Sequence, residues 1–150
     1  DYYEAESLLL KESLNNICNV IKDIRSGLKP ESQDHSKATV AEKIHKSEGL
    51  IDWATTSDEI KNKFLAFKKW PKVFFKFGGV NVEAVDLQLH SNDIGNPGEV
   101  YGFDQEALKI YCKDGVVAIT SVKFPGKKVI GSKDFFNSKR DIISRGDLLI

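Results

Sequence analysis

The sequence has no methionine and only two cysteines among its 150 residues. Because position 1 is not methionine either, we expect the chain to be a piece of a longer product. Cys18 and Cys112 lie far apart and form no CxxC or metal-ligand spacing, which argues against a disulfide framework or a zinc site. Reduced thiols of the cytosolic type are therefore expected.

Long apolar runs are also missing. None approaches the roughly 20 residues that a helix needs to cross a bilayer, and the acidic start DYYEAES does not resemble a signal peptide. These absences predict a soluble protein without a membrane partner. We expect it in the cytoplasm, or in an organelle, since the N-terminus of the longer product is not visible.

The charges balance overall but are distributed unevenly. Residues 1–59 contain 7 Lys and Arg against 12 Asp and Glu, whereas residues 60–150 contain 15 against 10. A net charge of −5 is thus followed by one of +5. Any anionic partner is expected to meet the second part.

Two helices are predicted in the first half of the chain. Apolar residues recur at three- and four-residue steps from Glu4 to Ser26, which predicts an amphipathic helix that ends at Gly27. The polar segment that follows has little periodicity and is expected to be a linker. The second helix begins with a capping box and should end before the proline of KKWPK, with three apolar residues on one face. The box is Thr56 with Glu59, and the face is Ile60, Phe64 and Phe67.

Beyond Pro71 the apolar period becomes two, which indicates strands. VFFKF and VNVEAVDLQL flank Gly78-Gly79 and predict a hairpin. GEVYGF, ALKIYC and VVAITSVKF follow, and Asp114-Gly115 is expected to supply the positive φ of a tight turn between the last two. Five short strands predict a mainly β fold, a small closed or nearly closed barrel with flanking helices. The residues that compete for the inner face of the hairpin are Val80, Val82, Ala84 (or Val85) and Leu87.

The end of the chain contains one more predicted helix. Ser132 is expected to cap SKDFFNSKR, whose Phe135 and Phe136 would plug onto the barrel. The apolar LLI after it either adds an edge strand or trails.

No residues form a recognisable catalytic or metal-binding pattern. His35, His45 and His90 are scattered, and none lies beside an obvious nucleophile or orienting acid. GGVNVE lacks the Lys-Ser/Thr pair of a phosphate loop, and Ser47-Glu48-Gly49 lacks the nucleophile-elbow pattern. We therefore predict that the chain contains no catalytic residues.

The basic residues are more informative, because they fall at junctions between predicted elements. Phosphate recognition requires several such charges on one face, and a five-stranded barrel with a basic rim recurs among polynucleotide-binding proteins. For each lysine alone, a solubilising surface charge is the alternative. Around Trp70 the alternative is that the indole plugs the end of the barrel. The alkyl chains of the neighbouring lysines would then lie along the apolar surface while their amines stay in solvent. The candidates are Lys43, Lys46, Lys68, Lys69, Lys72, Lys127, Lys128, Lys133, Lys139 and Arg140.

Three long stretches resemble, in order, the linker and C-terminal domain of methionyl-tRNA formyltransferases. They are QDHSKATVAEKIHKSEGLIDW, AFKKWP and GEVYGFDQEALKIYCKDGVVAITSVKFPGKKVIGSKDFFNSKR, and they cover about residues 33–141. The resemblance implies three parts. Residues 1–27 would be the terminal helix of a missing N-terminal Rossmann-like catalytic domain, residues 28–54 a linker, and residues 55–150 an OB-like, five- to six-stranded tRNA-binding domain.

The activity that the resemblance implies belongs to translation initiation, the first stage of protein biosynthesis. A formyl group passes from 10-formyltetrahydrofolate to the amino group of initiator methionyl-tRNA. The family's catalytic Asn, His and Asp match nothing here, so this fragment itself would hold no cofactor and no metal. The implied partners are the tRNA and the missing catalytic domain.

Several basic residues match the family's patterns directly. Lys43 and Lys46 fall on its AxKIxK pattern, and two further pairs fall on its GKK and on the basic pair after the last helix. The resemblance implies phosphate contacts for them, since tRNA is held largely through backbone and shape. Those pairs are Lys127 with Lys128 and Lys139 with Arg140.

The chain departs from the family near Trp70. It reads LAFKKWPK where the family reads RAFNPWPG, so an arginine is replaced by Leu65 while lysines are added.

Two alternatives to tRNA binding stay open. One is a paralogous formyl-group enzyme, such as a formyltetrahydrofolate hydrolase/dehydrogenase or a sugar-nucleotide formyltransferase. The other is a barrel with a structural role only.

Overall fold

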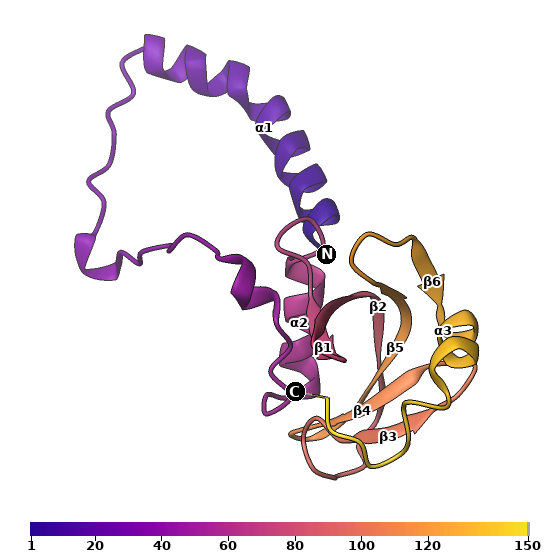
Figure 1. Cartoon of the computed structure of the whole chain (residues 1–150). Helices are drawn as coiled ribbons and strands as arrows, with labels where there is room; N and C mark the ends of the chain where they lie inside the picture. The colour runs from indigo at the N-terminus through magenta and orange to yellow at the C-terminus, as the bar shows by residue number, and fades with distance from the viewer. Residues whose placement is uncertain (150) are drawn as a thin grey trace. The chain divides into compact units, whose positions relative to one another are not determined.

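The computed structural model describes residues 1–149 and divides the chain into two compact units, with the boundary between Ile44 and His45. The first unit holds the helix α1 (Tyr2–Arg25) and a short 3-10 turn, η1 (His35–Lys37) (Figure 1). All the strands belong to the second unit. No helix among the described residues is long and apolar enough to span a membrane.

Helix α1 confirms the first predicted helix. The Asp1 side chain caps it by accepting hydrogen bonds from the amides of Tyr3 (2.9 Å) and Glu4 (3.2 Å), as an acidic N-cap residue does. The helix ends just before Gly27, whose φ is +91°. Its apolar stripe is exposed and includes Leu10, Leu14, Ile17, Ile21 and Ile24.

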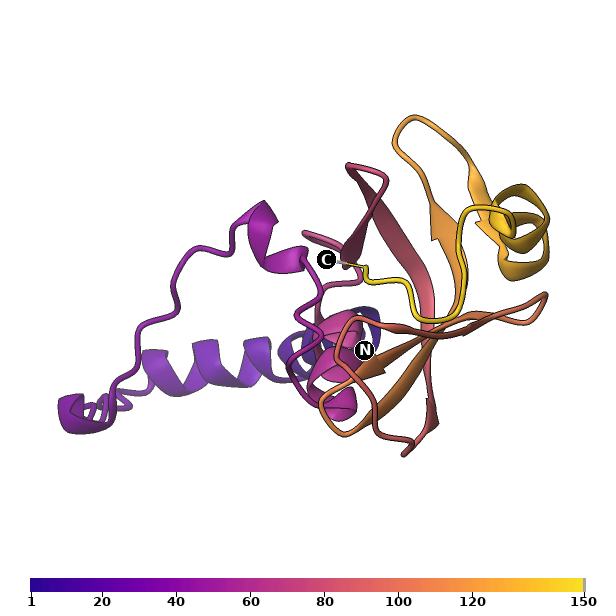
Figure 2. The same cartoon turned by 60° about the horizontal axis from the view of Figure 1, so that its bottom comes forward.

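The second unit is built on one antiparallel sheet of six strands. Their order is β1-β2-β5-β4-β3, and β6 pairs with the end of β5. The sheet curls into a half-barrel (Figures 1 and 2), which confirms the predicted mainly β, OB-like barrel. The strands are β1 (Phe74–Phe77), β2 (Val80–Ser91), β3 (Val100–Phe103), β4 (Leu108–Cys112), β5 (Gly115–Lys123) and β6 (Val129–Gly131).

Three short helical segments surround this sheet: η2 (Lys46–Gly49), α2 (Ser57–Ala66) and α3 (Ser132–Lys139). Helix α2 buries Ile60 and Phe64, as predicted, whereas Phe67 is only partly buried. Ile51 and Trp53 also belong to the core. The compact unit therefore takes in the last residues of the range expected to be a linker.

The inner face of the first hairpin differs from the prediction at one position. Val82, Ala84 and Leu87 are buried, but Val80 is 41% exposed. The pairing of β2 with β5 starts only at Glu83, so Val80 extends beyond the part of β2 that β5 covers. Irregular pairing between Ala84 and Leu87 lets both side chains face inward although they are three residues apart.

The turn between β4 and β5 is tight, but not for the predicted reason. Neither Asp114 nor Gly115 has a positive φ. Glycine is needed at position 115 because a Cβ there would lie 2.5 Å from the Ser91 carbonyl oxygen. The Asp114 carboxylate instead accepts a hydrogen bond from the Ser57 amide at 2.7 Å, which ties this turn to the start of α2.

The predicted cap of α3 is wrong. Gly131 is the N-cap residue and has no side-chain cap bond, while Ser132 is the first helical residue. The Ser132 hydroxyl donates to the Gln105 carbonyl at 2.8 Å. Phe135 is fully buried, as predicted, and Phe136 is half-buried.

Of the two possibilities for the tail, edge pairing is the one observed. Leu148 forms an antiparallel bridge with Glu99. The Val100 amide donates to the Asp147 carbonyl (2.8 Å), and the Leu149 amide donates to the Gly98 carbonyl (2.9 Å). Leu149 is buried, so this segment packs against residues 98–100, at the start of β3.

Two carboxylates at the first turn of α2 predict acid sensitivity. The Thr56 amide and hydroxyl donate to Glu59 at 2.8 and 2.7 Å. The backbone bond from Thr56 lowers the pKa of Glu59, and the backbone bond from Ser57 lowers the pKa of Asp114. A carboxylate whose folded pKa is lowered stabilises the fold above its unfolded pKa, and this contribution disappears as the pH falls through the folded value.

We therefore expect the urea midpoint of unfolding to fall as the pH drops below the ordinary pKa values of 4.5 for Glu and 3.8 for Asp. Asp114→Asn should lower the midpoint at neutral pH and flatten this acid dependence. Glu106→Gln, at an exposed position, should leave both unchanged. An Asp114→Asn variant that lost stability in parallel with the parent chain would contradict the assignment.

Candidate nucleic-acid interface

Two segments of the second unit are rich in lysine and contain no acidic residue. Residues 60–82 contain six lysines, and residues 115–133 contain four. The first segment includes β1 and the Gly78-Gly79 turn, and the second includes β5 and the Pro125-Gly126 turn. Because β2 pairs antiparallel with both β1 and β5, the two turns lie at the same end of the sheet (Figure 2).

A groove with a volume of about 560 Å³ lies at this end. We call it the lysine groove. Three lysines from three separate elements line it: Lys46 at the start of η2, Lys72 just before β1 and Lys123 at the end of β5. Glu83 is its one acidic residue. The rest of its lining is Pro71, Phe74, Gly79, Val80, Asn81, Phe124, Pro125 and Gly126.

Close backbone packing brings Lys46 and Lys72 to the same groove. The Ile51 amide donates to the Phe74 carbonyl at 2.8 Å. At Gly49 a Cβ would lie 2.2 Å from the Lys72 carbonyl oxygen and 2.9 Å from the Phe74 ring. The absence of a side chain at Gly49 therefore lets η2 lie against the start of β1.

Gly49→Ala should destabilise the second unit by about 1–3 kcal/mol, because the added methyl overpacks a buried contact with backbone. Gly102→Ala is the matched control, since a Cβ at Gly102 meets nothing within 4 Å. Urea unfolding of both variants checks the difference. Equal stability of the two variants would show that η2 can move away from Lys72 without cost.

A second groove, of about 440 Å³, adjoins the first. We call it the apolar groove. Lys127 from the β5–β6 turn and Lys139 from α3 line it, and the Lys139 amine lies 5.7 Å from the centre of the Phe124 ring. Ile130 and Ser138 also line the apolar groove, and neither of them lines the lysine groove. The residues that it shares with the lysine groove are Val80, Phe124 and Pro125.

The structure places four of the ten predicted basic residues in these two grooves and adds one. Lys46 and Lys72 line the lysine groove, and Lys127 and Lys139 line the apolar groove. The added residue is Lys123, which was not predicted. Its place at the end of a predicted strand, directly before the FPG turn, is a signal from which it could have been included.

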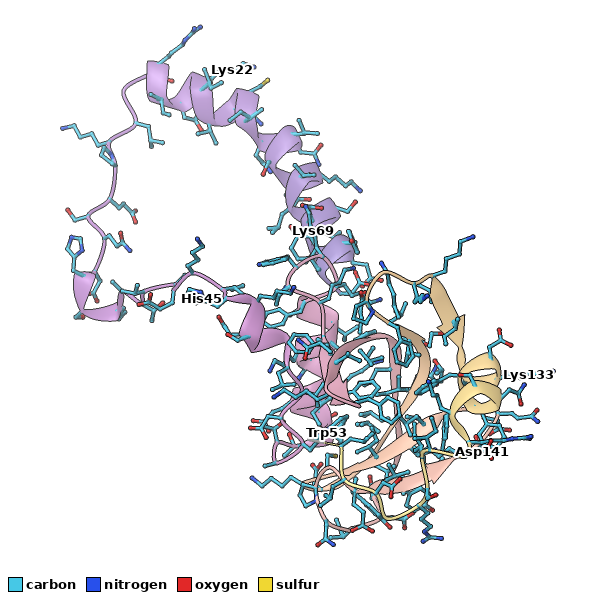
Figure 3. All side chains as sticks on the ribbon, in the orientation of Figure 1. Lys22, His45, Trp53, Lys69, Lys133 and Asp141 are labelled. Carbon is cyan, nitrogen blue, oxygen red and sulfur yellow. The ribbon has the colours of Figure 1, made fainter. Side chains whose placement is uncertain are left out.

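The other six predicted residues line neither groove. Lys43 belongs to the first unit. Lys68 lies with its amine 5.6 Å from the centre of the Phe64 ring, in the turn after α2. Figure 3 shows Lys133 on the outer side of α3. The remaining three are exposed, and they are Lys69, Lys128 and Arg140.

The interpretation in which Trp70 plugs the barrel is wrong. Trp70 does not plug the barrel, because 55% of it is exposed, and the neighbouring Pro71 is buried instead. The buried indole is that of Trp53, labelled in Figure 3, which is 6% exposed and belongs to the core. An exposed tryptophan thus stands in the lysine-rich segment 60–82, although it lines neither groove.

The three histidines of the chain do not take part in a metal-binding cluster within residues 1–149. No group of three or more His, Cys, Asp or Glu is placed to hold a metal ion there. His35 and His45 lie at short 3-10 turns, and the His90 ring packs 5.8 Å from that of Tyr101. The site that the described residues do provide is a basic, partly apolar surface suited to an extended anion.

This combination of an OB-like half-barrel and a basic groove defines a class of protein. Residues 43–140 match the family described as "Formyl transferase, C-terminal domain". The match covers more than half of the chain. The chain therefore belongs to the family of formyl transferase C-terminal domains.

Individual relatives carry a more particular name. The chain is 34% identical over 122 residues to a methionyl-tRNA formyltransferase of Pseudomonas entomophila, covering 81% of the chain and 39% of the relative. It is 31% identical over 150 residues to a methionyl-tRNA formyltransferase of Caldicellulosiruptor saccharolyticus, covering 97% and 45%. The chain thus spans less than half the length of these relatives.

Solved structures with the same fold include HypX from Aquifex aeolicus. One variant superposes with a TM-score of 0.59 at 21% identity, over 86% of this chain and 23% of HypX. The complex of HypX with tetrahydrofolic acid superposes with a TM-score of 0.58 at 20% identity, over 89% and 26%. At this level of identity the likeness concerns the fold alone.

Proposed function

We propose that this chain is the tRNA-binding C-terminal part of a methionyl-tRNA formyltransferase, which formylates initiator methionyl-tRNA with 10-formyltetrahydrofolate. The observation that carries the proposal is the lysine groove, in which Lys46, Lys72 and Lys123 converge from distant parts of a chain with zero net charge. Family membership and the names of the relatives support the same function.

In this proposal the chain positions the tRNA and takes no part in the chemistry. Residues 1–27 form the last helix of an upstream catalytic domain, which binds the folate co-substrate, and residues 28–54 form the linker, whose last part, from His45 on, packs into the second unit. The exposed apolar stripe of α1 supports this division, since such a stripe needs a partner surface. The match to 97% of the chain in the Caldicellulosiruptor relative, which is more than twice as long, supports it as well. The enzyme acts in the cytoplasm or in an organelle.

The tRNA backbone is the ligand that the basic residues recognise. Double-helical RNA is recognised mainly by its shape and by its phosphates and 2′-hydroxyls, and each lysine that neutralises a phosphate releases a counterion. The first contacts come from the lysines that line the two adjoining grooves, which are Lys46, Lys72, Lys123, Lys127 and Lys139. The remaining predicted residues extend the contact along the phosphates. They are Lys43, Lys68, Lys69, Lys128, Lys133 and Arg140.

A second candidate is the C-terminal part of another formyl-group enzyme that does not bind tRNA. The observation behind it is that HypX, which has been solved in complex with tetrahydrofolic acid, shares this fold. The two lysine-lined grooves favour the tRNA-binding function, since a barrel without a polyanionic ligand has no need to collect five lysines at one end of its sheet.

Filter binding of initiator tRNA to the chain at several salt concentrations tests the proposal. Four to six neutralised phosphates predict a slope of log affinity against log salt of about −3 to −5. Double-stranded DNA of equal length serves as the control for unspecific attraction. Absence of tRNA binding at low salt, or an affinity that salt leaves unchanged, would refute the proposal.

A further inference from the structure

Trp70 is an exposed aromatic ring in a segment without acidic residues. The residue is 55% exposed. Its neighbours in the chain are Lys69 and Pro71, and no Asp or Glu occurs between Glu59 and Glu83. Pro71 and the residue after it, Lys72, line the lysine groove, so the turn that carries Trp70 leads directly into the proposed phosphate site.

The turn that carries Trp70 is held in place on both sides. The Lys72 amide donates to the Phe67 carbonyl at 3.1 Å and closes the turn. Lys72 has a φ of +74°, and Val73 after it is buried, with its carbonyl accepting a hydrogen bond from the Ala84 amide at 2.9 Å. A ring presented on an anchored backbone loses little conformational freedom when a ligand covers it.

We propose that Trp70 is a stacking platform for an unpaired base of the bound tRNA, next to the phosphates held in the lysine groove. This inference rests on the proposed function. Proteins read RNA outside its double helices by stacking unpaired bases on aromatic rings, and such stacking is tolerant of sequence because every base has a π face. The surrounding lysines favour a nucleic acid over an apolar protein segment, because a covering protein surface would have to desolvate their charges.

Fluorescence of the 150-residue chain tests the stacking directly. The chain has two tryptophans, and Trp53 is buried. The difference in emission between the parent chain and Trp70→Phe therefore isolates Trp70 without changing the core. Added tRNA and an unstructured eight-nucleotide RNA should quench this difference signal, whereas a blunt double-stranded RNA should bind without quenching it.

Binding measurements provide the second readout. Trp70→Ala should weaken tRNA binding about 5- to 100-fold, which is the range for one base stacked on an aromatic side chain. The slope of log affinity against log salt should stay unchanged, since stacking releases no counterions. Trp70→Phe should retain most of the affinity, because a smaller ring still stacks. Unchanged melting temperatures of both variants exclude a loss of fold.

The failure of this inference is distinguishable from that of the proposed function. Suppose that tRNA binds with a steep salt dependence, does not quench the emission of Trp70, and binds Trp70→Ala as tightly as the parent chain. The stacking platform is then refuted, while the tRNA-binding function stands. The same holds if, in the longer enzyme, the upstream domain covers Trp70 and tRNA leaves its emission unchanged. If the parent chain binds no tRNA at all, both ideas fail.

Discussion

Replacing Lys46, Lys72 and Lys123 together by alanine should weaken tRNA binding about 100-fold at 0.1 M salt. These residues come from three separate elements and line one groove, so the variant removes three charges from one site. Each neutralised phosphate contributes roughly 0.7 to 0.9 to the salt slope, and the slope should therefore flatten by about 2. Filter binding or fluorescence titration between 50 and 200 mM salt measures both quantities.

The strand β5 offers a matched control for this loss. Lys123 stands at its end, and Lys113 lies in the turn before its start; both are exposed. Because an antiparallel strand of this length separates them by about 30 Å, Lys113→Ala changes the net charge equally without touching the groove. We expect Lys123→Ala alone to weaken binding severalfold and Lys113→Ala to have little effect. Equal effects of the two substitutions would mean that only the overall charge matters.

Phe135→Ala should cost about 3–5 kcal/mol of the free energy of unfolding. The ring is fully buried, and its centroid lies 5.0 Å from that of Phe103 and 5.8 Å from that of Phe124. Its removal leaves a cavity where α3 meets the sheet. Because α3 also carries Lys139, the same variant should weaken tRNA binding under conditions in which it is still folded.

The adjacent Phe136 is the control for this prediction. It is half-buried and makes one ring contact, 5.2 Å from Phe103, so Phe136→Ala should cost only about 1 kcal/mol. Urea unfolding of the two variants and the parent chain gives the comparison. If Phe136→Ala cost as much as Phe135→Ala, the assignment of the inward-facing residue of α3 would be wrong.

Local patterns predicted most of the elements of the second unit. The capping box of Thr56 and Glu59 specifies the start of α2 within four residues, and the turn at Gly78-Gly79 joins two strands that are neighbours in the chain. Such signals need no knowledge of the rest of the fold. The predictions that depended on distant contacts were the weaker ones. Ser132 is an example, because its hydroxyl binds Gln105, which is 27 positions away.

The candidate site shows the same division. The basic pairs and the turns that carry them can be read from the sequence, but which lysines share a groove depends on the pairing of β2 with both β1 and β5. That pairing is what adds Lys123 to the groove. The exposure of Trp70 could not be predicted from the sequence either. Its hydrophobicity suggests that it is buried, but in the structure Pro71 and Trp53 are buried and Trp70 is exposed.

The pairing of the tail with β3 has a consequence for how this barrel avoids unwanted association. Backbone bonds of Val100 and Leu149 pair the tail with the start of β3, and the Leu50 bridge to Phe74 covers the start of β1 at the other border of the sheet. A strand edge with satisfied hydrogen bonds offers no template for another chain to add to. Contacts with a partner are thereby directed to the turns at the lysine-rich end, where side chains rather than backbone decide what binds.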